Sequence, residues 1–193
     1  RLLHRSPNSI NSLDDYLKVF DTVELIQAGP QAVAEAIRIA INGAYRTGGM
    51  RELGPGGEGG DPHPAFAITR LELRFNPMKR TGALMKRGAE SGLFDVDRII
   101  LAACELVRES EIAYRGNFEC GLILCFGRDL SNAVNKTLAD KINYWKKLDS
   151  TIVGIDIAGP ESANSYSDIK SLATMAEIYR GAESGLGKTV HVG

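Results

Sequence analysis

The sequence predicts an α/β protein built as part of a TIM (β/α)8 barrel, with about four parallel strands, intervening helices, and further helices before the first strand. Short apolar segments alternate along the chain with segments of helical period, which is typical of parallel strands joined by helical crossovers. Several of these short segments end in glycine or charged residues, as strands do when their ends line a barrel mouth. The 193 residues are fewer than the roughly 250 of a typical closed barrel. We therefore predict a single incomplete barrel domain over residues 1–193.

Two helices are predicted before the first strand. Ser12 is suited to cap the first helix, and an apolar stripe at helical spacing follows it, formed by Leu13, Tyr16, Leu17 and Phe20. On spacing alone, this stripe is more typical of core packing than of a binding surface. Residues 31–45 repeat a helical pattern that ends at two glycines.

Residues 51–64 are rich in glycine and proline and predict a flexible insertion at the surface. A phosphate-binding loop is disfavoured, because such a loop follows a strand and opens a helix. His63 lies between two prolines of this insertion, where a solvated side chain is expected rather than a metal ligand.

Four strands and their crossover helices follow the insertion. Residues 67–75 alternate between charged and apolar side chains, as expected of the first strand. The remaining strands are predicted over the apolar residues 119–126, 150–157 and 187–193. Helical periodicity predicts the helices over residues 95–114, 131–148 and 168–184.

Composition narrows the classes of partner. The 23 Lys and Arg are balanced by 24 Asp and Glu, so no excess charge favours a nucleic acid or a membrane surface. No apolar run approaches the roughly 18 residues of a membrane-spanning helix. Cys104, Cys120 and Cys125 form no C-x-x-C pair, so we expect a reducing, cytoplasmic compartment. Buried apolar roles suit these cysteines better than zinc ligation.

Five blocks of sequence carry a likeness to a known family. They are SLDDYLKVF at residues 12–20, LELRFNP at 71–77, LILCFGRD at 122–129, TIVGIDIAGPE at 151–161 and TVHVG at 189–193. In this order they resemble the helix that roofs the purine pocket and the second to fifth barrel strands of the adenosine deaminase family. The last two blocks are similar to its Asp-Leu-Ala-Gly and Thr-Val-His-Ala-Gly-Glu segments.

This resemblance implies a function and roles for single residues. It implies that His191 binds a metal, that the Gly159 backbone lies against a purine ring, and that the roof helix walls the pocket through Leu13, Tyr16, Leu17 and Phe20. The implied cofactor of the complete protein is Zn²⁺, which lowers the pKa of bound water from 15.7 to about 7. The implied reaction is hydrolytic deamination of adenosine or a related aminopurine nucleoside, with release of ammonia.

The ligand set departs from the family pattern. The family's first strand carries a His-x-His pair, whereas His4 is followed by Arg5 and Ser6. The glutamate that serves the family as general acid would follow Gly193, so no catalytic residue is assigned. We expect the active unit to need further barrel strands, from the same polypeptide or another chain.

Two alternatives remain open. One is a catalytically inactive deaminase-like fragment or binding module that lacks most metal ligands. The other is a barrel hydrolase that acts on a different amino-substituted ring or on a phosphorylated purine.

Overall fold

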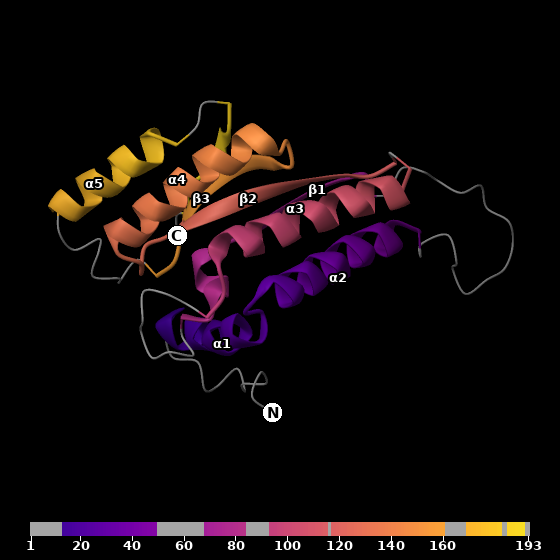
Figure 1. Cartoon of the computed structure of the whole chain (residues 1–193). Helices are drawn as coiled ribbons and strands as arrows, with labels where there is room; N and C mark the ends of the chain where they lie inside the picture. The colour runs from indigo at the N-terminus through magenta and orange to yellow at the C-terminus, as the bar shows by residue number, and fades with distance from the viewer. Residues whose placement is uncertain are drawn as a thin grey trace, which may run out of the picture.

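The computed structural model describes residues 13–49, 68–83, 93–115, 117–160, 169–182 and 185–191. These residues form a four-stranded parallel sheet with helices packed along it (Figure 1). In chain order the elements are α1 (Leu13–Ile26), α2 (Pro30–Gly49), β1 (Arg70–Phe75), the 3₁₀ helix η4 (Met78–Thr81), α3 (Val96–Ala113), β2 (Glu119–Gly127), α4 (Asn132–Leu148), β3 (Ile152–Ala158), α5 (Ile169–Arg180) and β4 (Gly187–Lys188).

The four strands are neighbours in the order in which they occur in the chain. Parallel neighbours require a crossover, which α3, α4 and α5 provide. The pairing of β2 with β3 skips Val153, which forms a bulge. A Cβ atom at Gly121 would lie 2.5 Å from the Val153 side chain, so the bulge requires glycine on the neighbouring strand. The predicted α/β fold with four parallel strands is confirmed.

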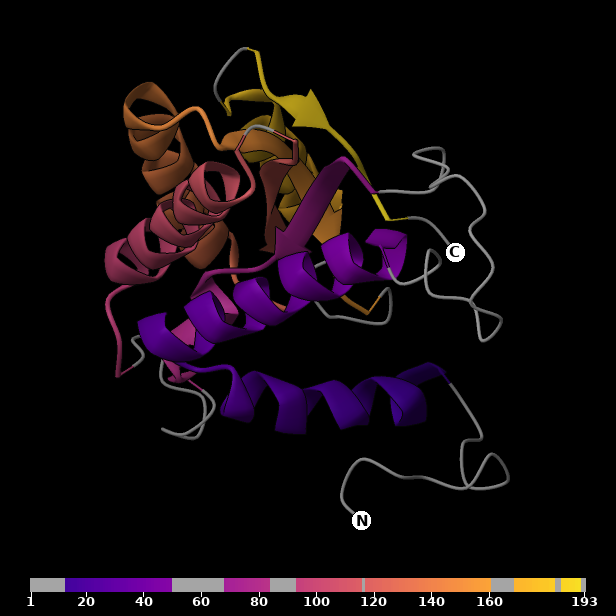
Figure 2. The same cartoon turned by 90° about the vertical axis from the view of Figure 1, so that its right-hand side faces the viewer.

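The main core lies between the sheet and the helices on one of its faces. Figure 2 shows α3 and α4 on that side of the strands. Leu122 and Leu124 of β2 and Ile155 of β3 are fully buried there. They share the core with α3, whose fully buried residues include Ile99, Ile100, Ala103, Cys104 and Val107. Burial of this apolar surface is the main driving force for docking the helices on the sheet.

The opposite face of the sheet carries polar side chains. Along β1, Leu71, Leu73 and Phe75 pack against the core, while the intervening Arg70 and Arg74 are exposed. This period-two alternation places charged groups on the face that a barrel would enclose.

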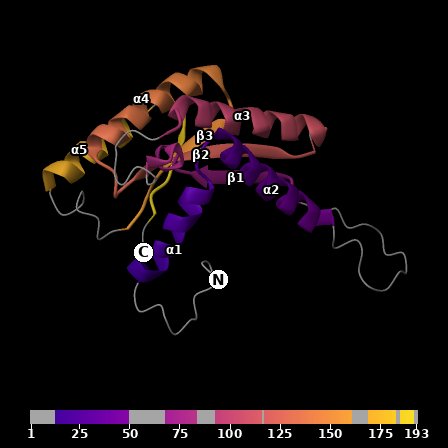
Figure 3. The same ribbon diagram turned by 60° about the horizontal axis from the view of Figure 1, so that its bottom comes forward.

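Helix α1 projects away from the layer formed by α3 and α4 (Figure 3). It is nevertheless tied to the segment that follows β1, because Glu24 forms an ion pair with Lys79 and the Gly29 N–H donates to the Arg80 carbonyl, 2.8 Å away. Helix α1 is therefore anchored beside the carboxyl end of β1.

The three cysteines are buried free thiols, as predicted, and burial raises the pKa of Cys120 and of Cys125 to about 12. Within the described ranges, no helix has both the length and the apolar character needed to cross a membrane. The predicted flexible insertion at residues 51–64 lies outside the described residues.

Helix α3 offers a matched test of the core. Ile99 is fully buried, whereas Ile112 on the same helix is 78% exposed. We expect Ile99→Ala to lower the free energy of unfolding by about 2–5 kcal/mol, because it leaves a cavity. Ile112→Ala should change it by less than about 0.5 kcal/mol. Urea unfolding followed by circular dichroism measures both values, and equal effects would contradict this description of the core.

Candidate functional site

The carboxyl ends of the strands converge on one buried carboxylate, that of Asp156 in β3. Its Oδ2 lies 2.6 Å from Nδ1 of His191 and 3.3 Å from a guanidinium nitrogen of Arg74. Its Oδ1 accepts a hydrogen bond from the Thr189 hydroxyl at 3.0 Å, and the Cys125 thiol lies 3.8 Å from Oδ2. We call these five residues the Asp156 cluster. It draws side chains from β1, β2 and β3 and from the segment that follows β4.

The cluster explains how Asp156 can be fully buried within an otherwise apolar strand. A buried carboxylate is costly unless charged or hydrogen-bonding groups compensate for the lost water. Arg74 supplies a positive charge, and Thr189 and His191 supply donors. The pKa of Cys125 is raised by burial first and by the negative charge of Asp156 second, so this cysteine remains a thiol at neutral pH.

The His191 backbone is placed by an extension of the sheet. Although β4 ends at Lys188, the Thr189 N–H donates to the Ile155 carbonyl at 3.0 Å and the His191 N–H donates to the Ile157 carbonyl at 2.9 Å. These bonds continue the parallel pairing with β3, so they carry His191 to the end of that strand.

The His191 ring turns its Nδ1 toward the Asp156 carboxylate. A neutral imidazole that donates from Nδ1 to a carboxylate keeps its lone pair on Nε2, and metal-binding histidines commonly use this arrangement. The side chain is 46% exposed. This contact is compatible with the metal-binding role that the resemblance implies for His191, which remains a prediction. Among the described residues, no group of three or more His, Cys, Asp or Glu side chains could hold a metal.

Gly159 lies next to His191 at the end of β3. Its φ of +112° is in the region that favours glycine. A Cβ atom there would lie 3.0 Å from Oδ1 of Asp129 and 3.2 Å from the backbone nitrogen of Arg128. The Arg128 guanidinium donates to the Gly159 carbonyl at 2.9 Å and also to the His191 carbonyl. One arginine thus joins the two residues that the sequence singled out for metal and purine binding.

An ion cluster ties α1 to the same end of the sheet. Lys79 Nζ lies 3.2 Å from Glu24 of α1 and 2.6 Å from Asp129, which follows β2. Burial by itself would lower the pKa of Lys79, but its hydrogen bond to Asp129 and the nearby acids outweigh burial and raise that pKa. Burial raises the pKa of Glu24, against the opposing effect of Lys79.

The pocket wall predicted on α1 is described only in part. Leu13, Tyr16 and Leu17 lie in α1, but their side chains fall outside the described residues. The Phe20 side chain is exposed. Their proposed contact with a purine remains a prediction.

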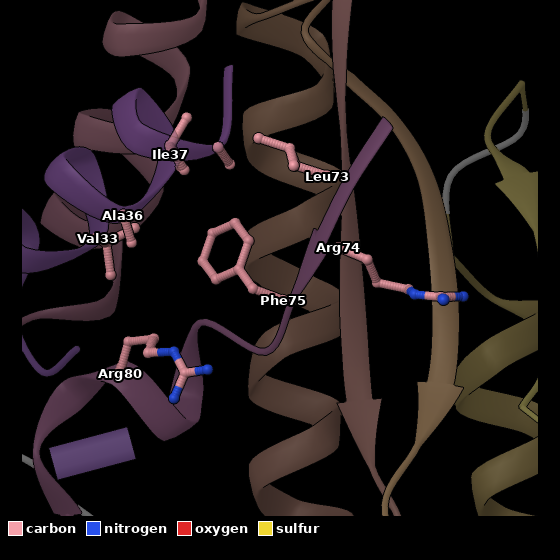
Figure 4. A pocket seen from close by; sticks show the side chains of 8 residues that line it. Val33, Ala36, Ile37, Leu73, Arg74, Phe75 and Arg80 are labelled. Atoms are coloured by element: carbon pink, nitrogen blue, oxygen red, sulfur yellow. The ribbon is translucent and has the colours of Figure 1, made fainter. Parts of the chain in front are cut away.

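A cavity of about 130 Å³ lies between α2 and β1 (Figure 4). Phe75 points from β1 toward α2, whereas the Arg74 side chain points toward the other face of the sheet. No predicted site residue lines this cavity, whose walls are Val33, Ala36, Ile37, Ala40, Leu73, Arg74, Phe75 and Arg80.

Asp156, Arg128 and Lys79 belong to this end of the sheet without a role predicted from the sequence. A signal was present for Asp156, because a single acid inside an apolar strand needs compensating groups nearby. The partners of all three residues come from other elements, so the sequence did not indicate which groups they would contact.

Comparison with known proteins supports the fold. No protein-family model and no curated protein matches the chain. The similar solved structures include a COG1816 amidohydrolase from Burkholderia ambifaria with bound Zn, which shares 15% identity at a TM-score of 0.65 over 100% of this chain and 42% of its own length. An adenine deaminase from Arthrobacter aurescens shares 17% identity at a TM-score of 0.62, covering 94% of this chain and 44% of that one. The N6-methyl-AMP deaminase of Arabidopsis thaliana shares 18% identity at a TM-score of 0.58, covering 94% and 45%.

This chain shares the fold of the corresponding part of these structures. The chain adopts part of a TIM (β/α)8 barrel, as the sequence predicted. It spans less than half the length of the structures it resembles.

The strained position of Gly159 can be tested against a glycine with room for a side chain. We expect Gly159→Ala to lower the free energy of unfolding by about 1–3 kcal/mol, because of its positive φ and close neighbours. Gly43 is exposed within α2, where an added Cβ would meet nothing within 4 Å. Gly43→Ala should raise the free energy of unfolding by up to about 1 kcal/mol. Chemical denaturation of both variants checks the opposite signs.

The raised pKa of Glu24 predicts a pH-dependent stability. A carboxyl group with a higher pKa in the folded state favours folding below its unfolded pKa, and this contribution is lost as pH rises through the folded pKa. Between about pH 4 and about pH 7, wild-type protein should therefore lose stability relative to Glu24→Gln. Urea titrations at both pH values measure the difference, and a constant difference would contradict the prediction.

Proposed function

We propose that the complete protein carrying this sequence is a zinc-dependent hydrolase that removes an amino group from adenosine or a related aminopurine nucleoside and releases ammonia. The observation that carries this proposal is the His191 ring, held 2.6 Å from buried Asp156 at the same strand ends as Gly159. The fold supports it, since two of the similar structures are named as deaminases of purine compounds.

His191 would hold the metal through Nε2, together with ligands from beyond the described residues. Zinc, when bound, supplies a nucleophile at neutral pH by lowering the pKa of its water to about 7. In that arrangement the Asp156 carboxylate would accept a hydrogen bond from Nδ1 and leave Nε2 for the metal. Arg74 and Thr189 in turn hold the carboxylate in place.

Gly159 would present its backbone to the purine ring. The absence of a side chain allows close approach, and the Arg128 guanidinium holds the Gly159 carbonyl in position. The apolar stripe of α1, formed by Leu13, Tyr16, Leu17 and Phe20, would cover the other side of the ring. The ion pairs of Lys79 with Glu24 and Asp129 hold α1 beside this end of the sheet.

Further strands would complete the barrel. In the described part of the chain, β1 and β4 each pair with one strand. We propose that these strands come from the same polypeptide or from another chain.

The substrate defines the main alternative within this class. Similar structures include the Arabidopsis N6-methyl-AMP deaminase and an Arabidopsis ADAL complexed with IMP. A phosphorylated purine is therefore a second candidate, and relative rates on adenine, adenosine, AMP and N6-methyl-AMP distinguish these possibilities.

A catalytically inactive module is favoured by a different observation. Among the described residues, no three His, Cys, Asp or Glu side chains are grouped so that they could hold a metal ion. Metal analysis of the complete protein separates the hypotheses, because an inactive module of this kind would contain no stoichiometric zinc.

His191→Ala tests the proposed metal site. In the complete protein we expect loss of stoichiometric zinc and a fall in ammonia release beyond the 10–100-fold typical for loss of a group that supports a metal ligand. His63→Ala, in the glycine- and proline-rich insertion, is the matched control and should retain both. Elemental analysis and a coupled ammonia assay give the two readouts. Retention of activity and zinc in His191→Ala would refute the assignment.

A further inference from the structure

We propose that Arg128 is a positioning residue that sets the separation between His191 and Gly159. The inference deepens the proposed function and rests on it, because these are the residues expected to bind the metal and the purine. Arg128 follows β2 directly and is 7% exposed. It donates to the Gly159 carbonyl at 2.9 Å through one terminal nitrogen and to the His191 carbonyl through the other.

The backbone of Arg128 is itself held in place. Its N–H donates to the Ala158 carbonyl at 2.8 Å, which continues the pairing of β2 with β3. The guanidinium then reaches past the end of β3 to the segment that follows β4. The side chain therefore starts from a rigid point and spans the ends of two further strands.

At His191 the pairing with β3 holds the backbone N–H, and Arg128 adds a contact at the carbonyl. Strand β4 ends at Lys188, and the His191 N–H is held by the Ile157 carbonyl at 2.9 Å. Arg128 holds the carbonyl of His191, and Asp156 holds its ring. With all three contacts the residue is restrained at its N–H, its carbonyl and its side chain.

The chemistry of arginine suits this task. A guanidinium is planar, and its donors have a fixed mutual geometry, so binding two carbonyls also fixes the distance between them. A lysine ammonium at the end of a flexible stem supplies charge but not that geometry. We therefore expect the bridging geometry, rather than the charge alone, to matter for the site.

The consequence for the reaction is a specific kinetic signature. Displacement of a reacting group by about 1 Å can cost about 100-fold in rate. Loss of the bridge should thus lower kcat about 100-fold, while KM, which also reflects contacts outside the bridge, changes much less. Zinc affinity should fall about 10-fold or more, because the orientation of a ligand is lost.

The test compares Arg128→Lys with Arg108→Lys in the complete protein. Arg108 also bridges elements, pairing with Asp149 just before β3, so it controls for the general effect of replacing a connecting arginine. Circular dichroism checks that each variant is folded. Measurements of kcat, KM, zinc affinity and hydrogen exchange at the His191 amide follow.

We expect Arg128→Lys to have a lower kcat, a lower zinc affinity and faster hydrogen exchange at the His191 amide. Arg108→Lys should show none of these changes. Arg128→Ala with added methylguanidinium provides a second variant, in which the small cation should restore zinc affinity and kcat. Unchanged zinc affinity, kcat and amide exchange at His191 in Arg128→Lys would overturn the inference. It would also be overturned if Arg128→Ala is folded and methylguanidinium restores neither its zinc affinity nor its kcat.

Failure of the proposed function gives a different result. Wild-type protein that binds no zinc and deaminates no aminopurine would refute that proposal directly. Hydrogen exchange at His191 still decides whether Arg128 positions this residue, because the exchange rate does not depend on activity. Faster exchange in Arg128→Lys alone would support positioning, and equal rates in both variants would overturn it.

Discussion

A carboxylate removed from water must be compensated by neighbouring groups, and this requirement organises the end of the sheet where the candidate site lies. Asp156 is buried in the middle of an apolar strand and obtains its donors from outside that strand. Removing one partner from a buried ionic group is costly, so each partner is held in a narrow range of positions. Arg74, Thr189 and His191 are therefore all oriented by their contacts with the Asp156 carboxylate.

The two faces of the sheet have different tasks. One face is buried against α3 and α4 and supplies the stability of the domain through apolar packing. The other face and the strand ends carry charged groups, including Arg74 and the Asp156 carboxylate. Packing on the first face keeps the backbone rigid, so polar groups on the second can be placed precisely. The cavity beside α2 belongs to the packing side and is lined mainly by apolar side chains.

The likeness to deaminase barrels concerns architecture, and chemistry depends on the groups carried at the strand ends. One imidazole is too little for tight zinc binding, since catalytic zinc sites typically use three protein ligands. What the structure shows is one imidazole held at the strand ends, which we propose as one of the ligands. The ring is oriented by Asp156, and the backbone is held by β3 and Arg128.

The sequence by itself determined the order of helices and strands and the parallel α/β fold class, and its resemblance to the adenosine deaminase family proposed His191 and Gly159 as site residues. Hydrophobic periodicity and capping act over a few residues, so they can be recognised without knowledge of the fold. The contacts of the site were decided only by the tertiary structure. Asp156 and His191 are 35 positions apart, and Arg128 lies 63 positions before the carbonyl that it holds. Such partners are selected by strand order, by register and by the bulge at Val153, which depend on packing of the whole sheet.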